Sequence, residues 1–137
     1  MKIVICGSMT AVKKMIEARD ILASNGHEVI LPKYSREYAT IEDIEGIHEE
    51  SAKNKVEHDL IRDYYNEIKN SDAILLVNER RHDVDGYIGG NSFLEMGFAH
   101  ILGKKIFLLN PIPDIGYRDE IEAMKPIVIN GDLSLIK

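Results

Sequence analysis

One acidic side chain stands in an apolar setting near the start of a predicted helix. Glu95 follows the polar, glycine-rich run at residues 89–92 and opens an otherwise apolar segment. At 3.6 residues per turn, Glu95 shares a helix face with Phe98, Ala99 and Leu102. A carboxylate on a face directed at the core is costly unless another group pairs with it or uses it. Glu95 is therefore the first candidate for chemistry, and a helix N-terminus favours the ionised form that a nucleophile needs.

The same residues admit a purely structural interpretation. Ser92 and Glu95 fit a capping box, in which serine is the N-cap and glutamate the third helical residue. In the functional interpretation, Gly89-Gly90-Asn91 lets the backbone approach a ligand closely at a helix N-terminus, which attracts anions. The pattern leaves both alternatives open.

A second short motif, Cys6-Gly7-Ser8-Met9-Thr10, lies between a predicted strand and a predicted helix. Its hydroxyl and backbone N–H groups suit either a turn with an N-cap or a cradle for phosphate. It matches neither the dinucleotide-binding G-x-G-x-x-G pattern nor the phosphate-binding P-loop.

Other acidic residues are candidate partners for Glu95. One face of a predicted helix over residues 50–70 carries Asp59, Arg62, Asp63 and Asn66. This face is either a solvated surface with ordinary ion pairs or the source of an acid that turns toward Glu95. Asp83 and Asp85, in a predicted loop, are rival acids.

Apolar periodicity predicts an alternation of strands and helices within one domain, residues 1–137. Strands are expected at residues 2–6, 27–31, 72–78, 105–110 and 126–129, and helices at 9–25, 50–70, 92–102 and 118–124. Residues 33–50 read as a loop. Uniformly apolar strands alternating with helices indicate a parallel sheet covered on both faces. We predict a doubly wound, flavodoxin-like α/β domain with five strands in the order 2-1-3-4-5.

Ligands of such folds bind beyond the carboxyl ends of the strands. Asp72, which begins its strand, is expected at the opposite edge. The residues expected to bind substrate at the ligand edge are Gly7, Ser8, Met9, Asn78, Gly89, Gly90, Asn91, Ser92 and Asn110.

Composition narrows the classes of partner. The formal net charge of −6 argues against a general binder of nucleic-acid polymers or membrane surfaces, both of which need a basic face. No apolar run is long enough to span a membrane, and the N-terminus lacks the layout of a signal peptide. The single cysteine suits a reducing cytoplasm, and the five histidines show no paired spacing for a metal. We therefore expect a cytoplasmic protein without a metal site.

The stretch from Gly89 to Ala99, followed by Gly103-Lys104-Lys105-Ile106, resembles the nucleoside 2-deoxyribosyltransferase family. The preceding residues 71–77 fit the family's strand before that motif. The opening Ile5-Cys6-Gly7-Ser8 is similar to the related deoxyribonucleoside 5′-monophosphate N-glycosidases. The resemblance implies a flavodoxin-like fold and cleavage or transfer of the N-glycosidic bond of a nucleoside or its 5′-monophosphate.

The resemblance also implies roles for individual residues. Glu95 matches the family's nucleophilic glutamate, which forms a covalent glycosyl-enzyme, while a second acid protonates the leaving base. Asp63 is the nearest match to that acid, although Tyr64 occupies the strict register. Gly89-Gly90 stands where family members often carry aspartate or serine.

The family further implies a homo-oligomer and no cofactor, because carboxylates carry the chemistry. Tyr64 and Tyr65 are candidates for packing between subunits. The departures from the family pattern keep an alternative open, a non-catalytic domain that binds or senses nucleotides.

Overall fold

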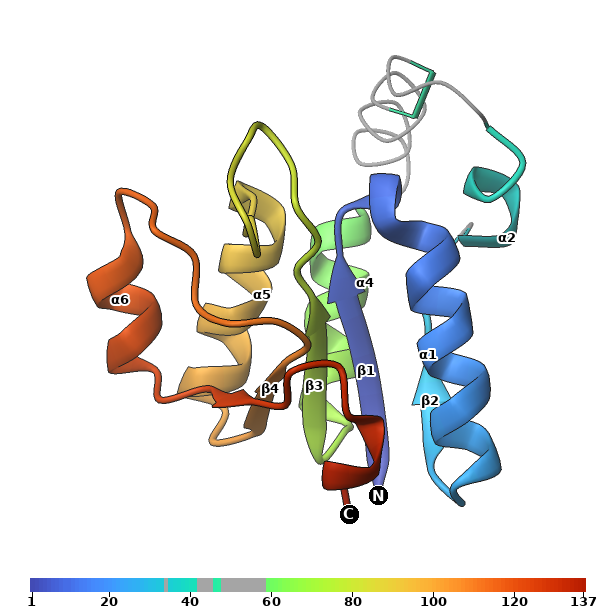
Figure 1. Ribbon diagram of the computed structural model, residues 1–137. Helices are drawn as coiled ribbons and strands as arrows, with labels where there is room; N and C mark the ends of the chain where they lie inside the picture. The colour runs from blue at the N-terminus through green and yellow to red at the C-terminus, as the bar shows by residue number, and fades with distance from the viewer. Residues whose placement is uncertain (34, 42–45, 48–58) are drawn as a thin grey trace.

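A single parallel sheet organises the chain, whose computed structural model describes residues 1–33, 35–41, 46–47 and 59–137 (Figure 1). Its strands are β1 (Lys2–Gly7), β2 (Glu28–Ile30), β3 (Ala73–Val77), β4 (Lys105–Leu108) and β5 (Ile127–Val128). They pair in the order β2-β1-β3-β4-β5, each parallel to its neighbours. The predicted α/β class and strand order are confirmed.

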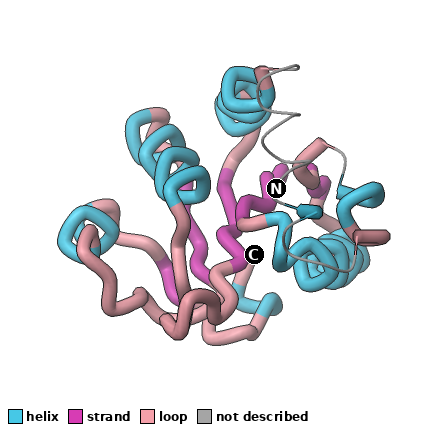
Figure 2. The backbone as a smooth tube through the Cα atoms, turned by 90° about the horizontal axis from the view of Figure 1, so that it is seen from above, coloured by secondary structure: helices cyan, strands magenta, loops and turns pink. Residues whose placement is uncertain are grey.

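Helices cover both faces of this sheet (Figure 2). The α-helices are α1 (Val12–Ser24), α2 (Ser35–Tyr38), α4 (Leu60–Lys69), α5 (Gly90–Ile101) and α6 (Arg118–Ala123), and the 3₁₀ helices are η1 (Met9–Ala11) and η2 (Leu133–Leu135). One buried cluster joins α1 and η2 to the sheet, and another joins α4, α5 and α6 to its other face.

The alternation of side chains along β1 determines which of them point to each face of the sheet. Ile3 and Ile5 belong to the cluster with α1, whereas Val4 and Cys6 belong to the cluster with α4 and α5. Successive side chains of a strand point to opposite faces, so the register of β1 directs the Cys6 thiol toward α5.

The start of α5 differs from the predicted start. The helix begins at Gly90 with Gly89 as its N-cap, two residues before the predicted Ser92, and its first turn contains no acidic residue. The extended backbone of Gly89 and the hydrogen bond from the Phe93 N–H to its carbonyl begin the helix without a side-chain cap. The capping-box interpretation is therefore wrong, and Glu95 lies in the second turn.

The segment before α4 also departs from expectation. A helix was predicted over residues 50–70. The structure contains α4 in the second half of this range, with Asp59 as its N-cap. Residues 50–58 lie outside the described residues. The region predicted as loop contains α2, whose first residue, Ser35, donates its hydroxyl hydrogen to the carbonyl of Pro32. That local bond closes a turn that apolar periodicity did not reveal.

One buried amide connects three segments at the carboxyl edge of the sheet. Asn78 is completely buried, and its side-chain NH₂ donates to the carbonyls of Gly86, Asn110 and Pro111 at 3.0–3.3 Å. Its side-chain oxygen accepts the Asn110 N–H at 2.9 Å. Gly86 is required here because its φ is +69° and an added Cβ would lie 2.6 Å from the Pro111 carbonyl oxygen. We call this arrangement the Asn78 clamp.

Asp72 lies at the opposite edge, as predicted. Its carboxylate accepts the Lys2 backbone N–H at 2.7 Å, just before β3 begins. Among the described residues, no helix is long and apolar enough to cross a membrane.

Replacing Asn78 with alanine should lower the free energy of unfolding by about 2–4 kcal/mol, because several hydrogen bonds are lost and buried backbone groups are left unpaired. Urea denaturation measures the change. Asn66→Ala is the matched control. Because Asn66 is exposed on α4, this substitution should change the free energy of unfolding by less than about 0.5 kcal/mol. Equal stability of the two variants would contradict the role of the clamp.

Candidate active site

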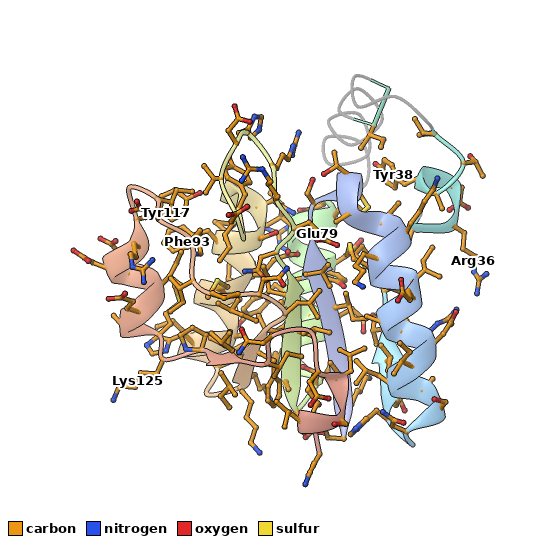
Figure 3. The ribbon with its side chains drawn as sticks, in the orientation of Figure 1. Arg36, Tyr38, Glu79, Phe93, Tyr117 and Lys125 are labelled. Carbon is orange, nitrogen blue, oxygen red and sulfur yellow. The ribbon has the colours of Figure 1, made fainter. Side chains whose placement is uncertain are left out.

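Two adjoining cavities open beyond the carboxyl ends of β1 and β3. The smaller has a volume of about 290 Å³ and includes Glu95 in its lining, and the larger has a volume of about 780 Å³ and includes Glu79. Figure 3 shows Glu79 near the tips of these strands. The residues common to both linings are Ser8, Met9, Thr10, Ile47, Arg81, Tyr87, Gly89 and Ser92. We call this set the shared wall.

The carboxylate of Glu95 is nearly enclosed, with 7% of the residue exposed. The second turn of α5 carries it to the end of β1, where the buried Cys6 thiol donates a hydrogen bond to it. Burial first, and then the negative charge and the hydrogen bond of Glu95, raise the pKa of Cys6 well above its ordinary value. The thiol therefore stays neutral and acts as a hydrogen-bond donor.

Tyr64 of α4 approaches the same place. Its hydroxyl donates to the backbone carbonyl of Ile5, and the residue lines the smaller cavity. Burial is the largest cause that raises the pKa of Tyr64 well above its ordinary value, and the nearby carboxylates of Glu95 and Glu67 raise it further. Cys6 and Tyr64 are therefore both neutral near Glu95, and neither transfers its proton at ordinary pH.

A cluster of donors occupies the shared wall. The Arg81 guanidinium donates to the Ser8 hydroxyl oxygen at 3.1 Å, and the hydroxyls of Ser8 and Thr10 are 2.8 Å apart. The Thr10 N–H also donates to the Ser8 oxygen, at 3.2 Å. Guanidinium, hydroxyl and backbone N–H groups are the donors that proteins use for phosphate oxygens. We call these three residues the Ser8–Arg81 cluster.

A tight turn delivers Arg81 to this cluster. Arg81 and Val84 exchange two backbone hydrogen bonds of 3.1 and 2.9 Å. The two residues between them, His82 and Asp83, have φ angles of +51° and +60°. Positive φ at both central positions is typical of the turns that close β-hairpins. The ring of His82 packs edge-on against Tyr87, with ring centroids 5.0 Å apart, which fixes the turn against the wall.

Most of the predicted substrate-binding residues line the smaller cavity. They are Gly7, Ser8, Met9, Gly89, Gly90, Asn91 and Ser92, which gather there with Glu95. Asn78 and Asn110 line neither cavity, because their side chains hold the clamp described above. A Cβ added to Gly90 would have no atom within 4 Å, so a side chain at this position would extend into free space.

The predicted acids are not brought to Glu95. Asp63 is exposed and lines neither cavity, while its neighbour Tyr64 faces inward. Asp59 pairs with Arg62 at 2.5 Å on the same solvated helix end. The rival acids Asp83 and Asp85 pair with Arg80, at 3.8 and 2.5 Å, and they also line neither cavity. The role of Asp63 as an acid stays a prediction that its position does not support.

Several lining residues escaped prediction. They are Pro32, Lys33, Tyr38, Ile47, Leu60, Arg81, His82 and Tyr87. Thr10, which the possible phosphate cradle included, also lines this cavity, whereas for Arg81 the available signal was its charge in the loop before α5. Among the residues that the structure describes, no group of three or more histidine, cysteine or acidic side chains suits a metal ion.

No family model matches the chain, and no curated protein matches it either. Among solved structures, the chain is similar to the CMP N-glycosidase BcmB of Clostridium botulinum, with a TM-score of 0.53 and 16% sequence identity. The match covers 98% of this chain and 92% of that one. At this identity the likeness shows a common fold, which spans nearly the whole chain.

The Cys6 thiol should stay protonated through the pH range near 8.5–9, where a free thiol ionises. Nuclear magnetic resonance of ¹³C-labelled cysteine measures its titration. In Glu95→Gln the pKa of Cys6 should fall, because the nearby negative charge is removed, although burial still keeps it raised. Asp63→Asn is the control and should leave the titration unchanged. A wild-type thiol that ionises at its ordinary pH would contradict this arrangement.

Proposed function

We propose that this protein cleaves the N-glycosidic bond of a nucleoside or nucleoside 5′-monophosphate, with Glu95 as the nucleophile. The observation that carries the proposal is a nearly enclosed carboxylate in the wall of a cavity at the ligand-binding edge of the fold. A buried carboxylate is costly to maintain, and such groups concentrate where chemistry uses them. The similar fold of a CMP N-glycosidase supports this choice of reaction.

The proposed reaction follows the logic of retaining glycosidases. A Glu95 oxygen attacks the anomeric carbon, the bond from carbon to the base nitrogen breaks, and the base leaves with the electron pair and takes up a proton. Water or a second base then attacks the same carbon and releases the Glu95 carboxylate. The Cys6 thiol orients one carboxylate oxygen by its hydrogen bond without neutralising the charge. Hydrolysis and transfer differ only in the second attacking group.

The other end of the substrate would meet the shared wall. The Ser8–Arg81 cluster supplies donors for a 5′-phosphate, and it lies beside the cavity that contains Glu95. The open space at Gly90 lets the sugar approach the backbone at the start of α5. No cofactor enters this scheme, since the nucleophile and the phosphate donors all belong to the chain.

One observation favours the second candidate function, a domain that binds or senses nucleotides without turnover. Among the described residues that line the smaller cavity, Glu95 is the one carboxylate, and none of the others is a second acid that could protonate the base. Binding without base release over a broad panel of nucleosides and nucleotides would favour this candidate.

Self-association remains part of the proposal. The outer side of α5 exposes Ile101 at 84% and Leu94 at 44%, beside a groove that also includes Tyr65 and Phe98. Tyr64, a predicted interface residue, is instead buried within its own subunit.

Glu95→Gln should reduce base release by at least about 1000-fold, because the amide cannot attack the anomeric carbon. The assay follows free base by chromatography over nucleosides and 5′-monophosphates of the common bases, with and without an added second base. Circular dichroism should show the wild-type fold.

Asp63→Asn is the matched control and should retain activity, since its carboxylate is exposed and outside both cavities. A folded Glu95→Gln protein with full activity would exclude Glu95 as the nucleophile. Loss of activity in Asp63→Asn alone would restore the acid role suggested by the sequence.

Gly90→Ala should keep the thermal stability of the wild type while weakening nucleotide binding by about tenfold. The added methyl group meets no protein atom within 4 Å but occupies space that the substrate needs. Calorimetric titration measures the affinity. Gly97→Ala is the control, because Gly97 is in the same helix and is equally unobstructed, but it lines a different groove. Equal binding by both variants would show that the substrate does not approach Gly90.

A further inference from the structure

The described lining of the larger cavity is basic although the chain as a whole is acidic. Its described lining includes four cationic side chains, Lys13, Lys14, Arg80 and Arg81, and one acidic side chain, Glu79. The formal net charge of the chain is −6. A local excess of positive charge inside a cavity of about 780 Å³ indicates an anionic ligand group.

Lys13 and Lys14 lie at a helix position that is unfavourable for cations. They occupy the first turn of α1, which contains no acidic residue, and a helix N-terminus disfavours cations. Within the described part of the chain Lys13 forms no ion pair, and Lys14 pairs at 3.6 Å with the exposed Glu17. Placements that oppose a local preference concentrate at functional sites. Both lysines are exposed and line the larger cavity, so their charges are available to an anion that binds there.

The two cavities meet at the donors assigned above to a 5′-phosphate. Ser8, Thr10 and Arg81 belong to both linings, with Glu95 on one side and the lysines on the other. A substrate with its anomeric carbon at Glu95 and its first phosphate at this wall has the basic cavity directly beyond that phosphate. Any further group attached to the phosphate enters the larger cavity.

We infer that the preferred substrate carries a 5′-pyrophosphate, whose second phosphoryl group binds among Lys13, Lys14, Arg80 and Arg81. The orientation of the substrate rests on the proposed function, which places the anomeric carbon at Glu95. Arg80 is held by Asp83 and Asp85 on the loop, so the lysines supply the cations least engaged within the protein. A nucleoside diphosphate and a dinucleotide joined through pyrophosphate share this chemistry.

The test measures binding to the Glu95→Gln protein, which does not consume its ligands. Calorimetric titration compares a nucleoside, its 5′-monophosphate, its 5′-diphosphate and its pyrophosphate-linked dinucleotide, for each common base. The 5′-diphosphate should bind about tenfold more tightly than the monophosphate, the gain expected from one charge-assisted contact. A dinucleotide that binds more tightly than the diphosphate would identify it as the source of the pyrophosphate. Equal affinity of mono- and diphosphate, or no binding of either, overturns the inference.

Matched variants locate the second phosphoryl group. The double variant Lys13→Ala with Lys14→Ala should remove the preference for the diphosphate and leave monophosphate affinity unchanged. Lys104→Ala with Lys105→Ala is the control, because these lysines precede or begin β4 at the opposite edge of the sheet. If the lysine variant binds the diphosphate as the control does, the assignment is wrong.

The outcome also separates this inference from the proposed function. A wild-type protein that prefers the diphosphate but releases no base sustains the basic subsite and overturns the glycosidase. A protein that releases base equally well from mono- and diphosphates sustains the glycosidase and overturns the subsite.

Discussion

The parallel pairing of β1 with β3 is the constraint on which the site depends. Ile3 pairs with Ala73 and Gly7 with Val77, so both strands end at the same edge. An added Cβ at Gly7 would lie 3.0 Å from the Val77 carbonyl oxygen and 3.3 Å from the Met15 sulfur, so glycine permits this close approach. The loops that follow the two strands then face each other, which makes contact between Ser8 and Arg81 possible.

The same register determines the surroundings of the carboxylate. Because Cys6 points to the face covered by α4 and α5, its thiol meets Glu95, while Tyr64 is engaged with the Ile5 carbonyl. A buried carboxylate without a hydrogen-bond partner would destabilise the fold. The neutral Cys6 thiol satisfies one hydrogen-bonding position of the Glu95 carboxylate.

The features that follow from periodicity and strand order were predictable from sequence. Buried strands, their order and the position of Glu95 at the ligand edge all arise from apolar patterns that extend over many residues. The start of α5 was not predictable from sequence. The backbone of Gly89 begins the helix, whereas the pattern of Ser92 and Glu95 suggested a side-chain cap at Ser92. A shift of two residues at a helix boundary is smaller than local propensity can resolve.

The direction in which individual side chains point was the second feature that the sequence did not predict. Asp63 and Tyr64 are adjacent, yet a rotation of one residue along α4 leaves the first exposed and the second in the cavity lining. Asn78 and Asn110 were correctly located at the carboxyl edge, but only the tertiary structure shows that they bind each other and the neighbouring backbone. The contribution of Arg81 depends on its contact with Ser8, which is distant in sequence.

The Asn78 clamp fixes where the loop between β3 and α5 begins. The clamp fixes the base of this loop to the sheet, and the turn at His82 and Asp83 fixes its tip, so the reach of Arg81 is set by loop length. Glu95 is set independently by α5. The separation between the Arg81 guanidinium and the Glu95 carboxylate therefore depends on the length of this loop. Inserting or removing residues in the loop would change that separation without moving Glu95.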